Sequence, residues 1–231
     1  MFGKLTAPTV DLLFPRRCLV CGSFDTHLCE RCAGAVRIQD SQRCSVCEAP
    51  TPWGLTHPGC LNSAKLDGIL AAGNFKQLQY LVHAMKYQLL QDLAVPLGRI
   101  LTEGVRHYGL ENFFSDFIII PVPLHAAKLR YRGFNQSALL AQTIASELAL
   151  TLAPRGLERV KNTDSQSMLP KPQRLQNIRG AFACPEPEVV AGKKILLIDD
   201  LATSCATLHE CAKVLKRAKA EMVWGLVLAH G

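Results

Sequence analysis

The residues best suited to chemistry follow a short apolar run near the end of the chain. Residues 195–198 read Ile-Leu-Leu-Ile, and the carboxylates of Asp199 and Asp200 come directly after them. Hydroxyl side chains then lead into an expected helix: Thr203, Ser204 and Thr207. The first amides of a helix lack internal partners and the helix dipole makes that end positive, so such a loop suits a phosphate. Two carboxylates at the end of a strand would accept hydrogen bonds from a ribose diol. The alternative is a buried strand followed by an N-capped helix, with capping or solvated aspartates.

Paired cysteines gather in the first 60 residues at the spacing of metal ligands. Seven of the ten cysteines lie between positions 18 and 60, and with His57 they form four pairs: Cys18 and Cys21, Cys29 and Cys32, Cys44 and Cys47, His57 and Cys60. Thiolate and imidazole donors suit Zn²⁺, which takes four ligands in a tetrahedron. We expect two structural ions, one shared by the first two pairs and one by the last two, with a crossed pairing as the alternative. Reduced cysteines that happen to pair are the other interpretation, and we expect His27 to be a surface residue.

A second candidate site follows the apolar run at 117–120. Residues 121–125 read Pro-Val-Pro-Leu-His, and residues 130–136 read Arg-Tyr-Arg-Gly-Phe-Asn-Gln. At the same sheet edge, their amides and guanidinium groups would bind a pyrophosphate. Alternatively, basic and aromatic side chains would bind the phosphates and bases of single-stranded nucleic acid. These residues are Lys128, Arg130, Tyr131, Arg132 and Phe134. A solvated loop with a buried Phe134 is a third interpretation. We expect His125 to be structural rather than a general base.

The elements that position these residues alternate between helical and β-type patterns. Apolar spacing predicts helices over 75–90, 92–107, 135–149 and 205–219, and short apolar runs predict strands over 117–120, 157–160, 195–198 and 222–229. This alternation indicates an α/β fold with a mostly parallel sheet, whose strands end at a common edge. Residues 161–180 are polar and contain Pro170 and Pro172, so we expect a mobile and functional loop there.

Length and composition favour a soluble, globular chain of two modest domains or one large one. The chain has 231 residues, of which 48% are hydrophobic, and no apolar run near the roughly 18 residues that span a bilayer. The N-terminus lacks a signal-peptide pattern, so we expect a cytoplasmic protein whose cysteines bind metal. The 26 basic and 19 acidic residues leave a net charge of +7, which favours phosphates or nucleic acid. The composition changes near residue 62, which predicts a zinc-ribbon-like module over 1–62 and an α/β domain over 63–231.

The segment from Ile195 to Thr207 resembles the phosphoribosyl pyrophosphate (PRPP) signature of type I phosphoribosyltransferases. Over roughly residues 10–230 the chain also resembles the ComF family of competence-associated proteins. The motifs that carry this likeness are the four pairs of metal-ligand residues, AMKY at 84–87, PVPLH at 121–125, RGFNQ at 132–136, Arg174 and Asn177 before GAF at 180–182, and IDDLATSCAT. The resemblance implies a zinc-ribbon-like module before a type I phosphoribosyltransferase-like domain, and a role with incoming single-stranded DNA in natural transformation.

The resemblance also implies which residues would bind PRPP. They are Asp199, Asp200, Leu201, Ala202, Thr203, Ser204, Cys205, Ala206 and Thr207, together with Pro123, Leu124 and His125. Arg174 and Arg179 join the nucleic-acid-binding set. Three positions depart from the family pattern: Ala202 replaces a larger aliphatic residue, Cys205 replaces glycine and His57 replaces cysteine. A Cβ and thiol at position 205 would crowd the phosphate or restrict the backbone, which bears more on catalysis than on binding.

These observations support three hypotheses of function. The first is a cytoplasmic competence factor that handles single-stranded DNA, with a domain that binds PRPP or a related phosphate, and with proteins of the DNA-uptake machinery as partners. The second is an active phosphoribosyltransferase, in which Mg²⁺ and the loops withdraw pyrophosphate from PRPP while a nitrogen nucleophile attacks. The third is an interaction scaffold with an empty site. The sequence leaves enzymatic activity open, and it defines neither a catalytic residue nor a nucleobase pocket.

Overall fold

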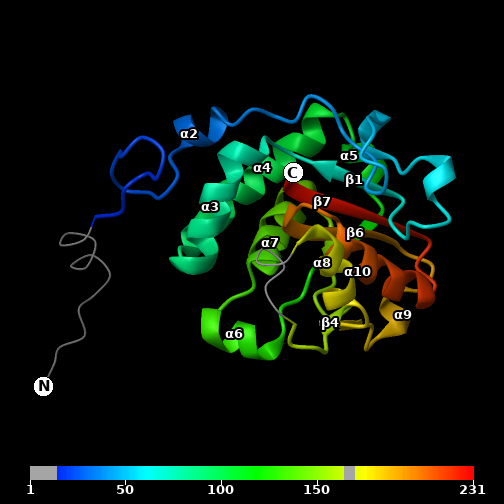
Figure 1. Cartoon of the computed structure of the whole chain (residues 1–231). Coiled ribbons are helices and arrows are strands. Elements are labelled where there is room, and N and C mark those ends of the chain that lie inside the picture. The colour runs from blue at the N-terminus through cyan, green and yellow to red at the C-terminus, as the bar shows by residue number, and fades with distance from the viewer. Residues whose placement is uncertain (1–14, 164–169) are drawn as a thin grey trace, which may run out of the picture.

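Five of the segments rich in apolar residues form a parallel sheet at the centre of the computed structural model, which describes residues 15–163 and 170–231 (Figure 1). The strand order is β1-β7-β6-β2-β3, and each neighbouring pair runs parallel. The strands are β1 (Gly68–Ala71), β2 (Phe117–Pro121), β3 (Thr151–Leu152), β6 (Lys194–Ala202) and β7 (Met222–His230). The prediction of an α/β fold with a mostly parallel sheet is therefore confirmed.

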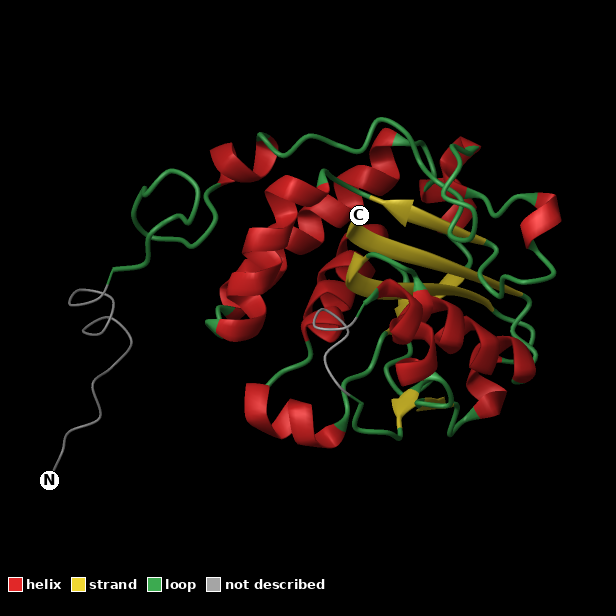
Figure 2. Ribbon diagram, in the orientation of Figure 1, coloured by secondary structure: helices red, strands yellow, loops and turns green. Residues whose placement is uncertain are grey.

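Alternate residues of each strand enter the two hydrophobic layers that cover the sheet, as the period of two in a β-strand requires. On β6, Leu196 and Ile198 join the core beneath three helices: α3 (Phe75–Tyr87), α4 (Ala94–His107) and α7 (Gln136–Leu148). Ile195 and Leu197 face the opposite core, beneath α10 (Ala206–Arg217). Figure 2 shows the strands between these two layers of helices. Parallel sheets are buried on both faces in this way, which explains the continuous apolar runs in the sequence.

Shorter elements complete the described chain. A small antiparallel pair is formed by β4 (Glu158–Arg159) and β5 (Phe182–Ala183). The remaining helices and helical turns are α2 (Glu30–Gly34), η1 (Pro52–Gly54), η2 (Pro58–Cys60), η3 (Gln91–Leu93), α5 (Glu111–Phe114), α6 (Ala126–Arg132), α8 (Lys171–Ile178) and α9 (Pro187–Val190). In the described ranges, no helix has both the length and the apolar character needed to cross a bilayer.

The structure corrects three expectations about these elements. The predicted loop over 161–180 contains α8, because Pro170 and Pro172 lie at its N-terminus, where proline is compatible with a helix, and Ile178 is buried; residues 164–169 lie outside the described residues. Strand β6 continues past residue 198 through both aspartates, because Asp199 pairs with Val227 of β7 and Ala202 pairs with His230. The predicted strand over 157–160 contributes the two-residue β4, outside the main sheet.

The N-terminal region packs against the rest of the chain, in part on helices and in part along the edge of the sheet. Residues 18–32 lie beside α3 and α4, residues 44–60 lie near β1, and an extended segment joins them (Figure 1). In that segment, Ile38 forms an antiparallel bridge with Gly73. The side chain of Gln42 donates to the carbonyl of Ala71 at 2.9 Å and accepts from its N–H at 2.8 Å. Residues 36–43 therefore cover the outer edge of β1. The division near residue 62 remains a proposal.

Candidate functional site

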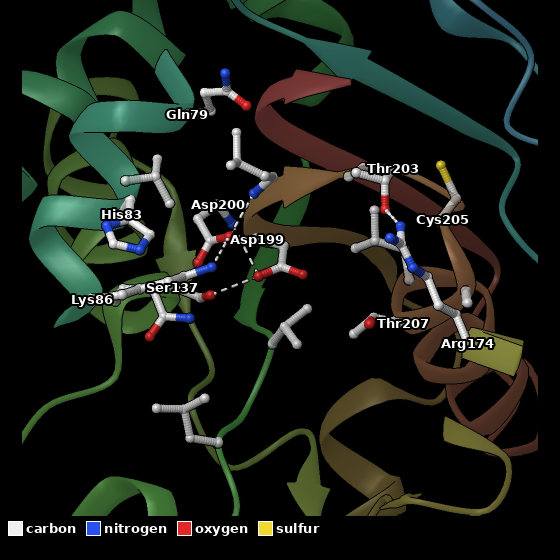
Figure 3. A pocket seen from close by; sticks show the side chains of 18 of the residues that line it. Gln79, His83, Lys86, Ser137, Arg174, Asp199, Asp200, Thr203, Cys205 and Thr207 are labelled. Atoms are coloured by element: carbon white, nitrogen blue, oxygen red, sulfur yellow. Dashed lines mark hydrogen bonds and ion pairs between the residues drawn. The ribbon is translucent and has the colours of Figure 1, made fainter. Parts of the chain in front are cut away.

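A cleft of about 660 Å³ opens at the carboxyl ends of β2 and β6. Its floor is the end of β6, and its walls come from α3 on one side and from the start of α10 on the other (Figure 3). Parallel strands end at a common edge and the following helices begin there, so this edge collects loops and helix N-termini. The cleft therefore brings together the two segments that the sequence singled out, Pro123 to Leu124 and Asp199 to Thr207.

The two neighbouring aspartates at the end of β6 form hydrogen bonds and an ion pair with different residues. Asp199 Oδ1 accepts a hydrogen bond from Ser137 Oγ at 3.0 Å and another from the N–H of Asp200 at 2.9 Å. Asp200 Oδ1 forms an ion pair with Lys86 Nζ at 2.6 Å and accepts from the N–H of Leu201 at 2.7 Å. Asp200 Oδ2 is buried and has no hydrogen-bond partner among the described residues. An unpaired buried carboxylate oxygen is costly unless a ligand supplies a donor.

The environment of Asp199 alters its protonation. Burial and the neighbouring charge of Asp200 raise the pKa of Asp199 to about 7, although Lys86 and the hydrogen bonds from the Asp200 N–H and Ser137 oppose this shift. Near its pKa, a carboxyl group is present in both the protonated and the ionised form. The protonated form of this carboxyl group can donate a hydrogen bond and the ionised form can accept one, and either suits a hydroxyl-bearing ligand.

The loop between β6 and α10 places hydroxyl groups at a helix N-terminus. Thr203, Ser204 and Thr207 line the cleft there, and a guanidinium nitrogen of Arg174 donates to Thr203 Oγ1. Helix α10 runs from Ala206 to Arg217, so its first amides lie in the same loop. Hydroxyl donors, orphan amides and a guanidinium group form a suitable site for a phosphate.

Cys205 occupies the bend of this loop. Its φ of 52° and ψ of 10° are left-handed, a conformation that favours glycine. The side chain is 3% exposed, and its Sγ lies 3.4 Å from His230 Nε2 at the end of β7. Figure 3 shows the sulfur directed away from Asp199 and Thr207. The backbone is thus held in a conformation unusual for cysteine, while the thiol packs against the neighbouring strand.

Only part of the segment that follows β2 lines the cleft. Pro123 and Leu124 line it, whereas His125 is not among its lining residues. Instead, His125 Nδ1 accepts from the N–H of Ala127 at 3.2 Å and caps the N-terminus of α6. This capping contact gives His125 a structural role.

The expected nucleic-acid-binding residues separate into three groups. Lys128, Arg132 and Arg174 line the cleft. Outside the cleft lining are the exposed side chains of Arg130, Tyr131 and Arg179. Phe134 departs from the expectation of base stacking, because its ring is only 6% exposed and belongs to the core beneath α3, α4 and α7. Burial of Phe134 agrees with the third interpretation on that point alone, because residues 126–132 form helix α6 rather than a loop.

Several cleft residues were not identified from the sequence. Lys86 appeared only within the AMKY motif, and Ser137 and Arg159 were not singled out, because their contacts depend on long-range folding. Gln79, His83 and Tyr87 line the α3 wall at intervals of four residues. That spacing, on the helix face opposite the apolar residues, was a signal available in the sequence.

The paired cysteines and His57 form two four-ligand clusters, in the sequential rather than the crossed arrangement. One contains Cys18, Cys21, Cys29 and Cys32, and the other contains Cys44, Cys47, His57 and Cys60. Within each cluster the ligand atoms lie within 4.8 Å of one another. Two sulfurs bound tetrahedrally to one Zn²⁺ lie about 3.8 Å apart, and the Sγ atoms of Cys21 and Cys29 are 3.7 Å apart. Both clusters fit structural zinc, and neither includes His27, which pairs with Asp92 at 2.7 Å.

Comparison with known proteins agrees with this architecture. Residues 9–61 match the double zinc ribbon domain, and residues 135–230 match the phosphoribosyl transferase domain. Among solved structures, glutamine phosphoribosylpyrophosphate (PRPP) amidotransferase from B. subtilis covers 60% of this chain and 26% of its own, with a TM-score of 0.41 and 18% identity, a likeness too distant to bear on function. Fold and site thus define a phosphoribosyltransferase-like protein with an N-terminal double zinc ribbon.

Three curated relatives identify the family. "Competence protein F" of Haemophilus influenzae is 29% identical over 226 residues, which are 94% of this chain and 98% of that protein. "DNA utilization protein YhgH" of Salmonella typhimurium is 32% identical over 212 residues, 86% of this chain and 89% of that protein. "Competence protein ComFC" of Bacillus subtilis is 34% identical over 115 residues, 49% of this chain and 45% of that protein. The chain belongs to this family of competence and DNA utilization proteins, which confirms the resemblance to ComF.

Proposed function

We propose that this protein is a cytoplasmic competence factor that handles incoming single-stranded DNA, and that its cleft binds PRPP or a related phosphorylated ribose. The observation that carries the proposal is the convergence of Asp199 and Asp200 with the Thr203 to Thr207 loop on one cleft. The names of the relatives, which refer to competence and DNA utilization, support the DNA role.

Each part of a phosphorylated ribose has a matching group in the cleft. The start of α10 and the hydroxyls of Thr203, Ser204 and Thr207 would bind the 5′-phosphate. Asp199 and Asp200 would bind the two ring hydroxyls, and Asp200 Oδ2 is the oxygen left without a partner among the described residues. Carboxylate and phosphate oxygens also suit Mg²⁺, which would accompany PRPP into the site.

The basic side chains around the cleft support binding of a DNA strand. Lys128, Arg132 and Arg174 line the cleft, and Arg130 lies exposed on the same helix as Arg132. With a net charge of +7, the chain would attract a polyanion. The double zinc ribbon packs against the rest of the chain and would present a second surface to DNA or to proteins of the DNA-uptake machinery.

A specific observation also favours the alternative of an active phosphoribosyltransferase. The Cys205 thiol contacts His230 instead of projecting between Thr203 and Thr207, so its side chain leaves room for the phosphate. In that reaction, the bond between C1 of PRPP and its pyrophosphate breaks while a nitrogen nucleophile bonds to C1, and the pyrophosphate leaves with its electron pair. The cleft would act mainly through positioning and electrostatic stabilisation.

Isothermal titration calorimetry with PRPP and Mg²⁺ tests the proposal. We expect the wild-type chain to bind, and the double variant Asp199→Asn/Asp200→Asn to lose at least tenfold in affinity. Asp116→Asn is the matched control, because Asp116 pairs with Lys194 at 2.7 Å and does not line the cleft. Absence of binding to the wild type, or equal binding to the double variant, would overturn the proposal. Release of pyrophosphate in the presence of nucleobases would distinguish the active enzyme from the binding protein.

A further inference from the structure

Helix α3 turns one polar stripe toward the cleft. Gln79, His83 and Tyr87 line the cleft at intervals of four residues, so they lie on one face of the helix. The opposite face is buried in the core through Leu78, Leu81, Ala84 and Met85. In Figure 3, Gln79 and His83 project from α3 on one side of the paired aspartates, and Thr203, Thr207 and Arg174 lie on the other side.

Two rings of this stripe form a small stacking surface. The ring centroids of His83 and Tyr87 are 4.5 Å apart, with an angle of 37° between the planes. The Tyr87 side chain is 54% exposed even though it lines the cleft. The guanidinium carbon of Arg132 lies 6.0 Å from the centroid of the Tyr87 ring. Aromatic rings beside a guanidinium group bind planar heteroaromatic ligands by stacking and cation–π attraction.

The ion pair between Lys86 and Asp200 fixes this stripe relative to the aspartates, since Lys86 lies between His83 and Tyr87 on α3. In a ribose 5-phosphate, the phosphate is carried on C5 and the base or leaving group on C1, at the opposite end of the ring. With the phosphate at the Thr203 to Thr207 loop and the hydroxyls at the aspartates, a substituent on C1 would extend away from that loop, and α3 forms the cleft wall on the far side of the aspartates.

We propose that Gln79, His83 and Tyr87 of α3, with Arg132 of α6, form a base-binding wall that receives a nucleobase. This inference rests on the proposed function, because the ribose and phosphate contacts set the direction of the base. His83, Tyr87 and Arg132 contact the faces of the ring, and the amide of Gln79 donates to and accepts from its polar edge. The base belongs either to a single strand of DNA or to a mononucleotide.

A purely structural role for the ring pair makes a different prediction. Side chains at this helical spacing contact one another and stabilise a helix slightly without any ligand. In that case, removal of the Tyr87 ring would lower the melting temperature without changing any preference for a base.

Fluorescence anisotropy with paired ligands tests the base-binding wall. The first arm compares a labelled single-stranded DNA with an abasic strand of equal length, which has the same phosphates but lacks bases. The second arm compares deoxyadenosine monophosphate with 2-deoxyribose 5-phosphate as competitors. We expect a preference of about tenfold for the base-bearing ligand in at least one arm. A preference in the first arm alone assigns the base to a strand, and one in the second arm alone assigns it to a mononucleotide.

Variants of α3 connect that preference to the wall. Tyr87→Ala should reduce the preference to less than threefold, while Tyr87→Phe retains it because the ring remains. Tyr80→Ala is the matched control, since Tyr80 lies on the same helix, is 51% exposed and does not line the cleft. No preference in either arm, or an equal loss in Tyr80→Ala and Tyr87→Ala, would overturn the inference. Retained PRPP binding with no base preference would refute the wall and leave the proposed function standing.

Discussion

Lys86 Nζ lies 2.6 Å from Asp200 Oδ1, although 114 residues separate the two along the chain. This ion pair joins the last turn of α3 to the carboxyl end of β6, so one wall of the cleft is attached to its floor. The carboxylate is almost completely buried, and the ammonium group reaches it from a partly exposed position. The contact therefore contributes both to the shape of the cleft and to the stability of the fold.

Removal of the Lys86 charge should destabilise the protein. Loss of one partner from a buried ion pair costs about 3–5 kcal/mol, and Lys86 keeps 22% of its side chain exposed, so we expect Lys86→Met to lower the free energy of unfolding by about 2–4 kcal/mol. Urea denaturation of the zinc-loaded chain at pH 8 measures this change. Lys76→Met, at an exposed position of the same helix, should change the free energy by less than about 0.5 kcal/mol. Equal losses in the two variants would contradict the assigned role of Lys86.

The raised pKa of Asp199 predicts that stability falls as the pH rises. The folded group keeps its proton up to about pH 7, whereas the unfolded group, with an ordinary pKa of 3.8, loses it near pH 4. The folded state therefore binds more protons between these values, and the free energy of unfolding decreases from about pH 4 to pH 7 by at most about 4 kcal/mol. Urea unfolding of the wild type and of Asp199→Asn over this range isolates the contribution of this group. A decline of the same size in the variant would refute it.

The two cysteine-containing clusters should bind two zinc ions per chain. Cys32→Ser and Cys60→Ser should each reduce the zinc content from two to one, because each removes one of four ligands. His57→Cys should retain both ions, since a thiolate replaces the imidazole. Cys184→Ser is the control outside the clusters and should also retain two. Elemental analysis of the purified variants measures these contents. A chain that stays folded and unchanged in circular dichroism after chelation would contradict a structural role for zinc.

Cys205→Gly tests whether the thiol interferes with the phosphate site. Glycine relieves about 1–2 kcal/mol of left-handed backbone strain, while loss of the buried thiol contact with His230 offsets part of this gain. We therefore expect stability within about 1 kcal/mol of the wild type and a PRPP affinity changed by less than threefold. Cys205→Val should be much less stable, because β-branched residues strongly disfavour this backbone conformation. A tenfold gain in PRPP affinity for Cys205→Gly would show that the cysteine does crowd the phosphate.

Affinity for single-stranded DNA should decrease as salt increases. Each contacted phosphate contributes about −0.7 to the slope of log affinity against log salt concentration. Arg130→Ala/Arg132→Ala should weaken binding and make the slope shallower by about 1.4, because two phosphate contacts are lost. Arg217→Ala, an exposed position at the opposite end of α10 from the cleft, should leave the slope unchanged. Titrations by fluorescence anisotropy from low to high salt measure the slopes, and binding that is insensitive to salt would contradict the role of these arginines.

Local patterns predicted the elements well where apolar residues repeat with one clear period. Helix α4 and strand β2 differ from their predicted ranges by at most two residues at either end, because each buries a regular apolar face. Helix α8 was not predicted because its sequence is polar and has prolines at its start. Prolines in a polar segment usually indicate a loop, although they are also compatible with the first turn of a helix. The extension of β6 through Asp199 and Asp200 was missed because its pairing with β7 cannot be read from polar residues.

The candidate site shows the same division between local and long-range information. The ligand clusters were predictable because two-residue spacings bring paired side chains to one ion, although the choice between sequential and crossed pairing required the fold. The cleft lining of Asp199 to Thr207 follows from a continuous motif. Lys86 and Ser137 reach the aspartates only after α3 and α7 pack on the sheet, so their partners could not be inferred from neighbouring residues.

The segment along the outer edge of β1 would connect zinc binding with protection of the sheet edge. β1 is the last strand on its side of the sheet, and Gln42 satisfies both backbone groups of Ala71, while Ile38 and Leu55 form bridges with Gly73 and Gly68. Uncovered strand edges pair readily with other chains. Because this covering segment is held at both ends by cysteine clusters, release of the metal would open a strand edge to a second molecule. Metal-depleted protein should therefore self-associate more than zinc-loaded protein, which size-exclusion chromatography would detect.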